Sequence, residues 1–452
     1  MAHSTFKGGT HPHDMKHYSE GRPIERARLP RKVIIPLSQH IGAPAAACVS
    51  IGDEVLTGQV IGTAGGFVSA PVHSSVSGKV VGLAKYPGSG GRDVLSVFIE
   101  ADGDDRWIKD PVADPGYASL DSAAIRNRIT EAGIVGLGGA TFPTHVKLSP
   151  PPTKKIEWLV INAAECEPYL TADHALMLEK AQETVIGISL LMKALGVEKA
   201  VVGIESNKMD AVAAMRTACQ SDSRIKVEVC QVKYPQGAEK NLIRALLDRE
   251  VPSGGLPMDV GVVVQNSGTA FAVYEAVVLG KPLLERVVTV TGPGIQQPRN
   301  LIVRVGTLFS DVISQCGGFR QGIQVTKVIS GGPMMGIAQY SLDVPVTKGT
   351  SGILALNDDE SPLRESGPCI KCGKCVEGCP MFLLPNTLSL IGEMGKVDMA
   401  MEYRVMDCVE CGTCAYVCPA GRSIVHYVRH LKAELADRKR KEAEKNSKKA
   451  NQ

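Results

Sequence analysis

Two copies of one cysteine pattern constrain the fold of this chain more than any other feature of its sequence. The copies share the spacing Cys-x2-Cys-x2-Cys-x3-Cys-Pro and lie near the C-terminal end. They contain Cys369, Cys372, Cys375 and Cys379, and then Cys408, Cys411, Cys414 and Cys418. Eight of the thirteen cysteines are thus clustered. In a chain without a secretory signal this clustering indicates metal or redox chemistry, since disulfides are rare in reducing compartments.

The spacing is that of bacterial ferredoxins, which hold four-iron clusters. Three thiolates on one tight loop bind three corners of a cubane, and the fourth cysteine, which leaves on a helix, points to the other cluster. We therefore expect one cluster on Cys369, Cys372, Cys375 and Cys418, and a second on Cys408, Cys411, Cys414 and Cys379. Structural zinc is the alternative, but its ligands come as two well-separated pairs. The segment predicts two 4Fe-4S clusters close enough to exchange electrons.

Charge is distributed unevenly along the 452 residues, whose length predicts several domains. Nine Lys or Arg and four Asp or Glu lie between Arg429 and Gln452, so the remainder of the chain carries −2 of the net +3. A nearly neutral body argues against a nucleic-acid groove and predicts no nucleic-acid partner. The basic tail begins with helical periodicity and then dissolves into RKRKEAEKNSKKANQ. This favours a solvated, partly disordered extension or an electrostatic contact with anionic lipid or with acidic faces of membrane partners.

No apolar run approaches the roughly 18 residues that span a bilayer. The best candidate, Val185–Val197, is interrupted by Lys193. The N-terminal MAHSTFKGGTHPHDMKH lacks the apolar core of a secretory signal. We expect a cytoplasmic chain without a membrane span of its own, for which peripheral attachment stays possible.

Strand-like and helix-like patterns alternate between Tyr117 and Gly280. Apolar runs typical of buried strands lie at Trp158–Ile161, Ala200–Ile204, Val227–Cys230 and Val260–Val264. Helical periodicity covers Ala172–Leu195, Asn207–Cys219, Glu239–Leu247 and Thr269–Leu279. This alternation predicts a parallel, doubly wound sheet of the Rossmann-like kind, in which ligands bind at the carboxyl ends of the strands.

Polar loops follow three of these strands: Asn162–Pro168 (NAAECEP), Tyr234–Lys240 (YPQGAEK) and Gln265–Thr269 (QNSGT). A glycine-rich segment, Gly133–Lys147 (GIVGLGGATFPTHVK), precedes the first strand. It matches neither a P-loop nor a dinucleotide fingerprint, and alone it is often only a tight turn. Together with the three strand ends it predicts a ligand site.

These segments carry a resemblance. GLGGATFPTHVK followed by NAAECEP resembles the flavin loop and the acidic loop of the NADH-binding flavoprotein subunit of respiratory complex I. The order of the parts, from an FKGGTHPHDMK leader to a two-cluster ferredoxin segment, resembles the C subunits of the Rnf complexes. The resemblance covers nearly the whole chain except the tail. It implies an electron-transfer subunit, peripheral on the cytoplasmic face of the inner membrane, in an ion-translocating ferredoxin:NAD+ oxidoreductase complex. Its partners would be the other subunits and a ferredoxin-type iron–sulfur protein.

The resemblance also implies a non-covalent FMN in the α/β domain. The backbone at Gly136, Gly138 and Gly139 would approach the flavin. Lys147 would contact its phosphate. Its neutral hydrogen-bond partners would be Asn162, Asn266 and Thr269.

For NAD(H), the resemblance implies a second set of residues in the same loops. Glu165 and Glu167 would line the side from which the dinucleotide approaches. Glu239 would contact its ribose, and Phe142 would stack on it. The remaining residues that the resemblance assigns to the cofactors are Tyr234 and Gly237.

Three positions depart from the complex I pattern. Leu137 replaces an Arg, Ala164 an Asp and Ala238 a Glu. The two alanines favour one alternative, a non-enzymatic scaffold whose clusters relay electrons from a partner's flavin. A stand-alone NADH-dependent corrinoid or quinone reductase is the other alternative.

The predicted architecture is a multidomain α/β chain. A leader (1–30) precedes a barrel-sandwich β domain (31–112), the FMN/NADH-binding α/β domain (113–282) and a soluble ligand-binding β-grasp module (283–350). A two-cluster ferredoxin-like domain (360–430) and the basic tail (431–452) follow. The β domain lacks the lysine hairpin of biotinyl and lipoyl carriers, so no swinging arm is expected.

Overall fold

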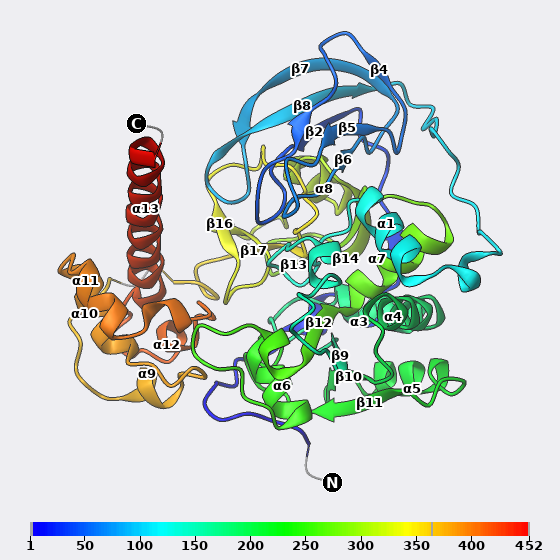
Figure 1. Cartoon of the computed structure of the whole chain (residues 1–452). Helices are drawn as coiled ribbons and strands as arrows, with labels where there is room; N and C mark the ends of the chain where they lie inside the picture. The colour runs from blue at the N-terminus through cyan, green and yellow to red at the C-terminus, as the bar shows by residue number, and fades with distance from the viewer. Residues whose placement is uncertain (1–2, 363–364, 451–452) are drawn as a thin grey trace.

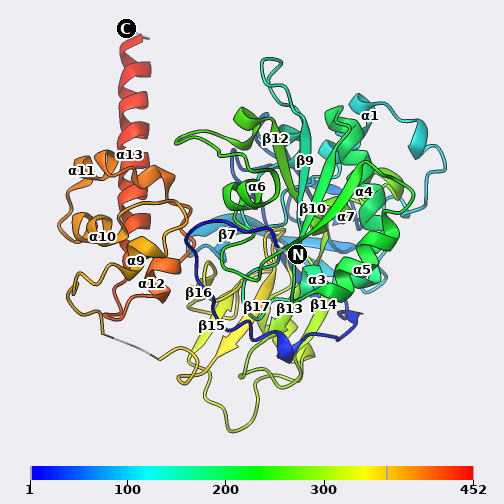
Figure 2. The same ribbon diagram turned by 90° about the horizontal axis from the view of Figure 1, so that it is seen from below.

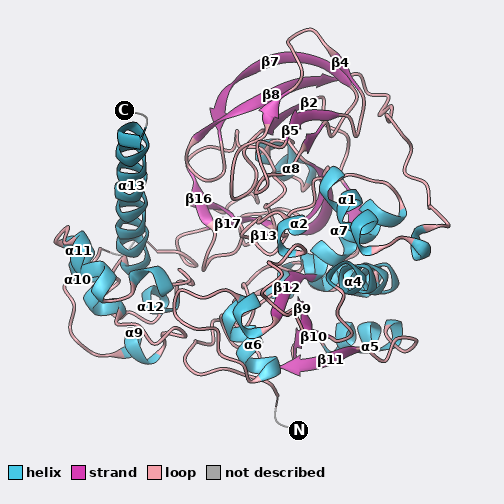
Figure 3. Cartoon of the chain, viewed as in Figure 1, coloured by secondary structure: helices cyan, strands magenta, loops and turns pink. Residues whose placement is uncertain are grey.

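The computed structural model describes residues 3–362 and 365–450. Three β-rich or α/β parts pack together, and a helical lobe formed by the C-terminal segment stands beside them (Figure 1). Coloured by secondary structure, strands dominate the upper part of the molecule, while the lobe consists of helices joined by loops (Figure 3).

The N-terminal β domain consists of two small antiparallel sheets. Strands β2 (Lys32–Pro36), β8 (Asp93–Ala101), β7 (Gly78–Pro87) and β4 (Glu54–Val55) form one, in that order. Strands β3 (Ala46–Ala47), β5 (Val60–Thr63) and β6 (Val72–His73) form the other. Val33, Ile61 and Val97 from both sheets share one buried core. This is the barrel-sandwich type of fold that the short, turn-rich strands predict.

A four-stranded parallel sheet is the centre of the α/β domain. Its order is β11 (Ile225–Cys230), β10 (Ala200–Glu205), β9 (Trp158–Asn162) and β12 (Val262–Asn266). The chain moves outward from β9 to β11 and then returns to the other side of β9, so the strand order reverses between β9 and β12. In open α/β sheets this switch point is where ligands bind.

Helices cover both faces of this sheet because successive side chains of a strand point to opposite sides. Leu159 and Ile161 pack beneath α1 (Ser122–Glu131), α4 (Ala181–Leu195), α5 (Met209–Ala218) and α7 (Ser267–Val278). Val160 packs on the opposite face, with α6 (Glu239–Leu247). The sequence therefore predicts this sheet to within about two residues at each strand end.

The predicted helix Ala172–Leu195 is in fact two helices, α3 (Ala172–Glu179) and α4. Lys180 lies between them with φ −131°, and its carbonyl accepts a hydrogen bond of 2.7 Å from the Thr184 hydroxyl. The break lets α3 pack against α5 while α4 packs against α7. Apolar periodicity runs through the junction, which is why the sequence pattern did not reveal it.

The β-grasp module has a six-stranded sheet in the order β1, β14, β13, β17, β15, β16. Four strands, β13 (Glu285–Thr291), β14 (Arg299–Arg304), β15 (Lys327–Ser330) and β16 (Ile337–Gln339), come from the expected segment. Strand β1 (Ile24–Arg26) belongs to the leader, and β17 (Gly352–Leu356) follows residue 350. The sheet packs on α8 (Phe309–Gln315) through Phe309. The leader is therefore part of this fold.

Five helices form the C-terminal lobe: α9 (Lys374–Glu377), α10 (Pro385–Glu393), α11 (Val397–Glu402), α12 (Thr413–Tyr416) and α13 (Ile424–Ala450). The one-turn helices α9 and α12 occupy equivalent places in the two cysteine runs, so the sequence repeat is also a structural one. Leu388, Ile391 and Val428 lie in the core of the lobe.

The prediction that the tail dissolves after one helical stretch is wrong. Helix α13 continues for 27 residues and projects away from the lobe in both views (Figures 1 and 2). Ala, Lys, Arg and Glu are strong helix formers. In addition, ion pairs between neighbouring turns support the helix, such as Asp437 with Arg440 at 2.5 Å and with Lys441 at 3.1 Å. None of the helices in the described part of the chain is both long and apolar enough to cross a membrane.

Candidate cofactor sites

Two asparagines meet at the switch point of the parallel sheet. Asn162 ends β9 and Asn266 ends β12, and the two are register partners. The Asn266 side chain caps α7, since its oxygen accepts hydrogen bonds from the backbone N–H groups of Gly268 (2.9 Å) and Thr269 (3.3 Å). Its amide nitrogen donates to Asp173 at 2.7 Å. Asn266 thus connects the strand end at the floor of the crevice with the N-terminus of α7.

The glycine loop lies over this floor and is anchored at both ends. Leu137 N–H donates to the Thr269 hydroxyl at 2.9 Å, and Gly136 N–H donates to the Phe142 carbonyl at 2.8 Å. Between these anchors Gly138 and Gly139 are exposed. A Cβ on Gly138 would lie 3.4 Å from Cβ of Asn266, and Gly139 has φ +110°, which L side chains rarely adopt. The loop therefore presents bare backbone above the strand ends.

The loop after β11 closes the opposite side of the crevice. Asn162 Nδ2 donates to the Gly237 carbonyl at 2.7 Å, and Gly237 N–H points to Cys166 Sγ at 3.3 Å. Lys147 donates to the Val264 carbonyl at 3.1 Å and lies 3.5 Å from the Glu239 carboxylate. The structure thus brings the glycine loop and all three predicted strand-end loops to one edge of the sheet.

Several buried polar atoms at this edge have no hydrogen-bond partner within the described residues. They are Gln265 Nε2, Ser267 Oγ, Gln236 Nε2 and Gln236 Oε1. Unpaired buried polar groups are rare, and each costs about 1–3 kcal/mol. Two of these residues flank Asn266 and one precedes Gly237, so the unpaired groups lie next to the crevice.

Two buried lysines that the sequence did not single out lie beneath the acidic loop. Lys208 Nζ donates to the Ala164 carbonyl at 2.9 Å and to Glu205 at 3.2 Å. Lys16, from the leader, donates to the carbonyls of Glu165 (3.0 Å), Glu167 (3.1 Å) and Leu170. Burial lowers the pKa of Lys16, and the nearby carboxylates of Glu165 and Glu205 oppose this effect. No local pattern marks Lys16, because its partners are about 150 residues away.

Both acidic residues expected beside the dinucleotide have other partners in the structure. Glu165 accepts hydrogen bonds from the backbone of Asp173 (2.7 Å) and His174 (3.2 Å), at the N-terminus of α3. Glu167 accepts from the backbone of Met335 (2.8 Å) and Met334 (3.1 Å), in the β-grasp module. Burial raises the pKa of Glu167 to about 7, against these bonds. Backbone N–H groups distant in sequence thus hold the Glu167 carboxyl, and its contact with a dinucleotide stays a prediction.

Tyr234 and Phe142 also differ in their surroundings. Tyr234 is buried, and its hydroxyl donates to the carbonyl of Cys411, in the helical lobe, at 2.7 Å. The same hydroxyl lies 3.4 Å from the Glu167 carboxylate of the acidic loop. The place of Tyr234 among the cofactor contacts stays a prediction. Phe142 is half-buried at the base of the glycine loop, which its carbonyl helps to close.

Arg286 is a buried cation under the glycine loop. It is the second residue of β13, in the next module, and is 7% exposed. Its guanidinium lies 3.4 Å from the carbonyl of Leu137, the residue that replaces an Arg in the complex I pattern. Burial lowers the pKa of Arg286 to about 10, and Asp173 opposes this effect. The sequence could not assign Arg286 to the site, since it belongs to a different domain.

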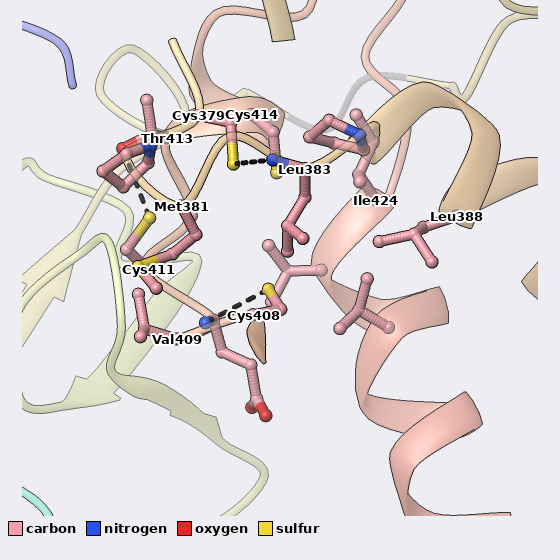
Figure 4. A pocket seen from close by; sticks show the side chains of 16 residues that line it. Cys379, Met381, Leu383, Leu388, Cys408, Val409, Cys411, Thr413, Cys414 and Ile424 are labelled. Atoms are coloured by element: carbon pink, nitrogen blue, oxygen red, sulfur yellow. Dashed lines mark hydrogen bonds between the residues drawn. The ribbon is translucent and has the colours of Figure 1, made fainter. Parts of the chain in front are cut away.

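The eight clustered cysteines surround two hollows in the helical lobe. The first is lined by Cys379, Cys408, Cys411 and Cys414 together with apolar side chains such as Leu383, Leu388 and Ile424 (Figure 4). The second is lined by Cys369, Cys372, Cys375 and Cys418. The fourth cysteine of each run thus lies with the first three of the other. Within the described residues, no group of three or more His, Cys, Asp or Glu side chains is arranged to hold a single metal ion.

Backbone and side-chain groups in the first hollow approach the sulfur atoms. Leu383 N–H points to Cys379 Sγ, Glu410 N–H to Cys408 Sγ, and the Cys411 thiol to the Thr413 hydroxyl, each at 3.4 Å (Figure 4). Hydrogen bonds to the sulfurs and burial are the features by which proteins tune iron–sulfur potentials. The donors, spacing and lining of both hollows fit 4Fe-4S clusters.

Comparison with protein-family models divides the chain in the same order. Residues 4–104 match the RnfC barrel sandwich hybrid domain, and residues 129–275 match the Nuo51 FMN-binding domain. Residues 287–338 match the SLBB domain, and residues 368–422 match a 4Fe-4S dicluster domain.

Known proteins are similar over nearly the full chain. The C subunit of the proton-translocating ferredoxin:NAD(+) oxidoreductase complex of Clostridium ljungdahlii is 49% identical, over 95% of this chain and 94% of its own length. Its Na(+)-translocating counterpart of Acetobacterium woodii is also 49% identical, over 98% and 99%. The C subunit of the ion-translocating oxidoreductase complex of Rhodobacter capsulatus is 41% identical, over 96% and 84%.

Proposed function

The chain belongs to the family of the C subunits of ion-translocating ferredoxin:NAD(+) oxidoreductase complexes, and from this premise we propose that it exchanges electrons between NAD(H), FMN and two 4Fe-4S clusters. One observation carries the proposal. A crevice with bare glycine backbone at the switch point and two hollows lined by four cysteines each occur in one chain, and a hydrogen bond from Tyr234 to the Cys411 carbonyl connects the loop beside the crevice with the first hollow.

The residues of the crevice fit an FMN. The exposed backbone of Gly138 and Gly139 and the N-terminus of α7 would receive it, and Lys147 would approach its phosphate. Asn162, Asn266 and Thr269 would orient it, and the unpaired groups of Gln265 and Ser267 could be completed by its polar atoms. When bound, FMN supplies the conversion between a transferred hydride and single electrons.

For the dinucleotide, the residues that remain at the crevice are Glu239 and Phe142. Glu239 is within reach of Lys147 at the mouth, and Phe142 is half-exposed beside the glycine loop. Glu165 and Glu167 would act indirectly, by holding the loop in place through their backbone hydrogen bonds. Ala164 and Ala238 offer only methyl groups where the complex I pattern has carboxylates, so dinucleotide affinity rests on fewer charged contacts.

We place the chain peripherally on the cytoplasmic face of a membrane complex. The relatives are named as subunits of proton-translocating and Na(+)-translocating complexes, and no helix in the described residues is long and apolar enough to span a bilayer. Ion movement would then belong to other subunits. A ferredoxin-type protein would exchange electrons with the cluster lobe.

Anaerobically purified protein with both clusters and FMN provides the test. NADH should bleach the flavin absorbance, and the iron content should approach eight atoms per chain, four for each predicted cluster. Gly138→Val should lose FMN while keeping its iron, since a branched side chain would occupy the space in which the exposed glycine backbone would meet the cofactor. The scaffold alternative, which Ala164 and Ala238 favour, is supported instead if bound FMN is never bleached by NADH.

A further inference from the structure

In the described part of the chain, the hydrogen bonds between the cluster-bearing lobe and the flavin-binding body gather around the 407–412 segment and Gly378. Tyr234 of the body donates to the Cys411 carbonyl at 2.7 Å. A Cβ on Gly412 would lie 2.6 Å from the Met334 carbonyl, which shows how closely the 408–414 loop packs on the β-grasp module. Gly254 N–H donates to Asp407 at 3.0 Å, just before this loop. These contacts surround the hollow that Cys408, Cys411 and Cys414 line.

The leader adds further contacts between the flavin-binding body and this side of the lobe. Its trace runs from the α/β domain toward the lobe (Figure 2), where Gly9 N–H donates to the Gly378 carbonyl at 2.8 Å. Gly378 directly precedes Cys379, the fourth cysteine of this hollow. Thr10 pairs with Tyr234 through two backbone hydrogen bonds of 2.8 Å. Leader, Tyr234 and cluster loop thus form one connected unit.

The second hollow has different surroundings. Cys372 is exposed and Cys369 is half-exposed. In the described part of the chain, the hydrogen bonds of the 367–372 and 419–422 segments stay within the lobe, for example those from Arg422 to Ser389 (2.9 Å) and Glu393 (2.6 Å). This hollow therefore faces away from the flavin-binding body and toward solvent.

Tyr234 is placed to connect the flavin crevice with the first hollow. It begins the loop whose Gly237 touches Asn162 and Cys166, at the switch point. Its own side chain is 1% exposed and ends on the main chain of Cys411, one of the cysteines of the first hollow. A single loop therefore spans the distance between the crevice and the nearer hollow.

Resting on the proposed function, we propose that Tyr234 is a positioning residue that holds the 408–414 loop on the flavin-binding body. The cluster on Cys379, Cys408, Cys411 and Cys414 then exchanges electrons with FMN. The cluster on Cys369, Cys372, Cys375 and Cys418 exchanges them with the external partner.

The electron balance is simple. With FMN held in the crevice and a cluster in each hollow, a hydride from NADH and one proton would enter at the crevice. Two electrons would leave singly, one to each cluster, and two protons would return to solvent. Electron transfer slows steeply with distance, so the loop that Tyr234 holds decides which cluster receives each electron first. The Tyr234 hydroxyl also directs the positive end of its dipole at the main chain of a cluster ligand, which would favour the reduced, more negative cluster and raise its potential.

Tyr234→Phe in the full-length protein tests the positioning role, since it removes one hydroxyl and keeps the ring. Both clusters and FMN should remain, by iron and flavin content. In an EPR redox titration with dithionite, the potential of the cluster in the first hollow should fall. The potential of the cluster in the second hollow should stay unchanged. Cluster reduction by NADH should slow at least about tenfold (roughly 1.4 kcal/mol of barrier) while flavin bleaching keeps its rate. Tyr416→Phe, at an exposed tyrosine of the same lobe, is the matched control and should change none of these.

Two single-cluster variants test the order. In Cys372→Ala, NADH should still reduce the remaining cluster, that of the first hollow, at a fast rate. In Cys411→Ala, NADH should reduce the remaining cluster, that of the second hollow, slowly. Equal rates in the two variants, or unchanged potentials in Tyr234→Phe, would overturn the inference. The dithionite titration needs no NADH, so it tests Tyr234 even if NADH fails to bleach the flavin and the proposed function is lost.

Discussion

Single residues from distant parts of the sequence determine the shape of the acidic loop. The carbonyls of Ala164, Glu165 and Glu167 point to the buried ammonium groups of Lys208 and Lys16. Such an arrangement fixes the loop from beneath and leaves its other side for a ligand. The leader, which looks like an extension in the sequence, therefore contributes a side chain to the support of the crevice.

Lys16→Met should lower both stability and FMN affinity. The variant leaves three carbonyls without their donor, which costs about 1–3 kcal/mol. The melting temperature should fall by several degrees, and FMN should dissociate more readily in an equilibrium titration. Lys7→Met, at an exposed leader lysine, is the control and should leave both values unchanged. Equal behaviour of the two variants would contradict a supporting role for Lys16.

Glu167 should make stability depend on pH. Burial raises its pKa from an ordinary 4.5 to about 7. The protonated carboxyl therefore contributes stability that is fully present below about pH 4.5 and is lost as the pH rises through 7. Glu167→Gln resembles the neutral form, so its stability advantage over wild type should grow between pH 5 and pH 8 by up to about 2–3 kcal/mol. Thermal melts at both pH values measure it.

The matched control for this pH effect is Glu228→Gln, at an exposed position of β11. The difference in stability between Glu228→Gln and wild type should be the same at pH 5 and at pH 8. If Glu167→Gln shows no growing difference, the carboxyl is ionised throughout this range in the folded protein.

At the scale of elements, sequence patterns predicted what is local. The four strands of the parallel sheet and the equivalent helices of the cysteine repeat follow from periodicity and spacing, which act over a few residues. The grouping of Cys379 with the 408–414 loop was also predictable, because the ferredoxin spacing encodes the crossing. The break at Lys180 and the continuous helix α13 were missed. The packing of α3 and α4 on different helices determines the break at Lys180. Ion pairs between neighbouring turns support the continuation of α13.

For the candidate crevice, too, the sequence predicted the local features and missed the contacts between distant segments. The loops that gather at the switch point could be predicted, since parallel strands bring their carboxyl ends to one edge. The hydrogen-bond partners of Glu165, Glu167 and Tyr234 could not be predicted, because they lie in other elements: helix α3, the β-grasp module and the cluster loop. Arg286 and Lys16 were missed for the same reason.

Helix α13 should attach the protein to anionic surfaces. It projects from the lobe and carries exposed basic side chains (Figure 1). Replacing Lys439, Lys441 and Lys445 with Gln should weaken co-sedimentation with vesicles that contain anionic lipid, by up to about 1 kcal/mol per lysine. The loss should be largest at low ionic strength, where screening is weak. Replacement of the exposed Lys7, Lys109 and Lys226 changes the net charge equally and should have little effect. Equal losses would indicate a response to net charge alone.

At the scale of the whole molecule, the chain divides its work between two separable parts. The flavin crevice is built from the α/β domain, supported by the leader and by Arg286 of the β-grasp module. The clusters lie in a lobe with its own core. Direct contacts between the two parts are concentrated at Tyr234, the leader and the 408–414 loop. Hydride exchange should therefore be independent of the lobe's cofactors, whereas electron delivery should not.

Replacing both Cys372 and Cys411 with Ala should separate these two activities. Each substitution removes one ligand from a different hollow, so both clusters should be lost or depleted, as iron analysis would show. The crevice residues are untouched, so NADH should still bleach FMN and support reduction of a small artificial acceptor at close to the wild-type rate. Reduction of a ferredoxin-like protein should fall at least about a hundredfold (roughly 2.7 kcal/mol of barrier), because the path from the crevice to the exposed side of the lobe is broken. Cys48→Ala, at an exposed cysteine of the β domain, should affect neither activity. If the double variant still delivered electrons to the protein acceptor, that acceptor would take them at the flavin, and the lobe would not be the route.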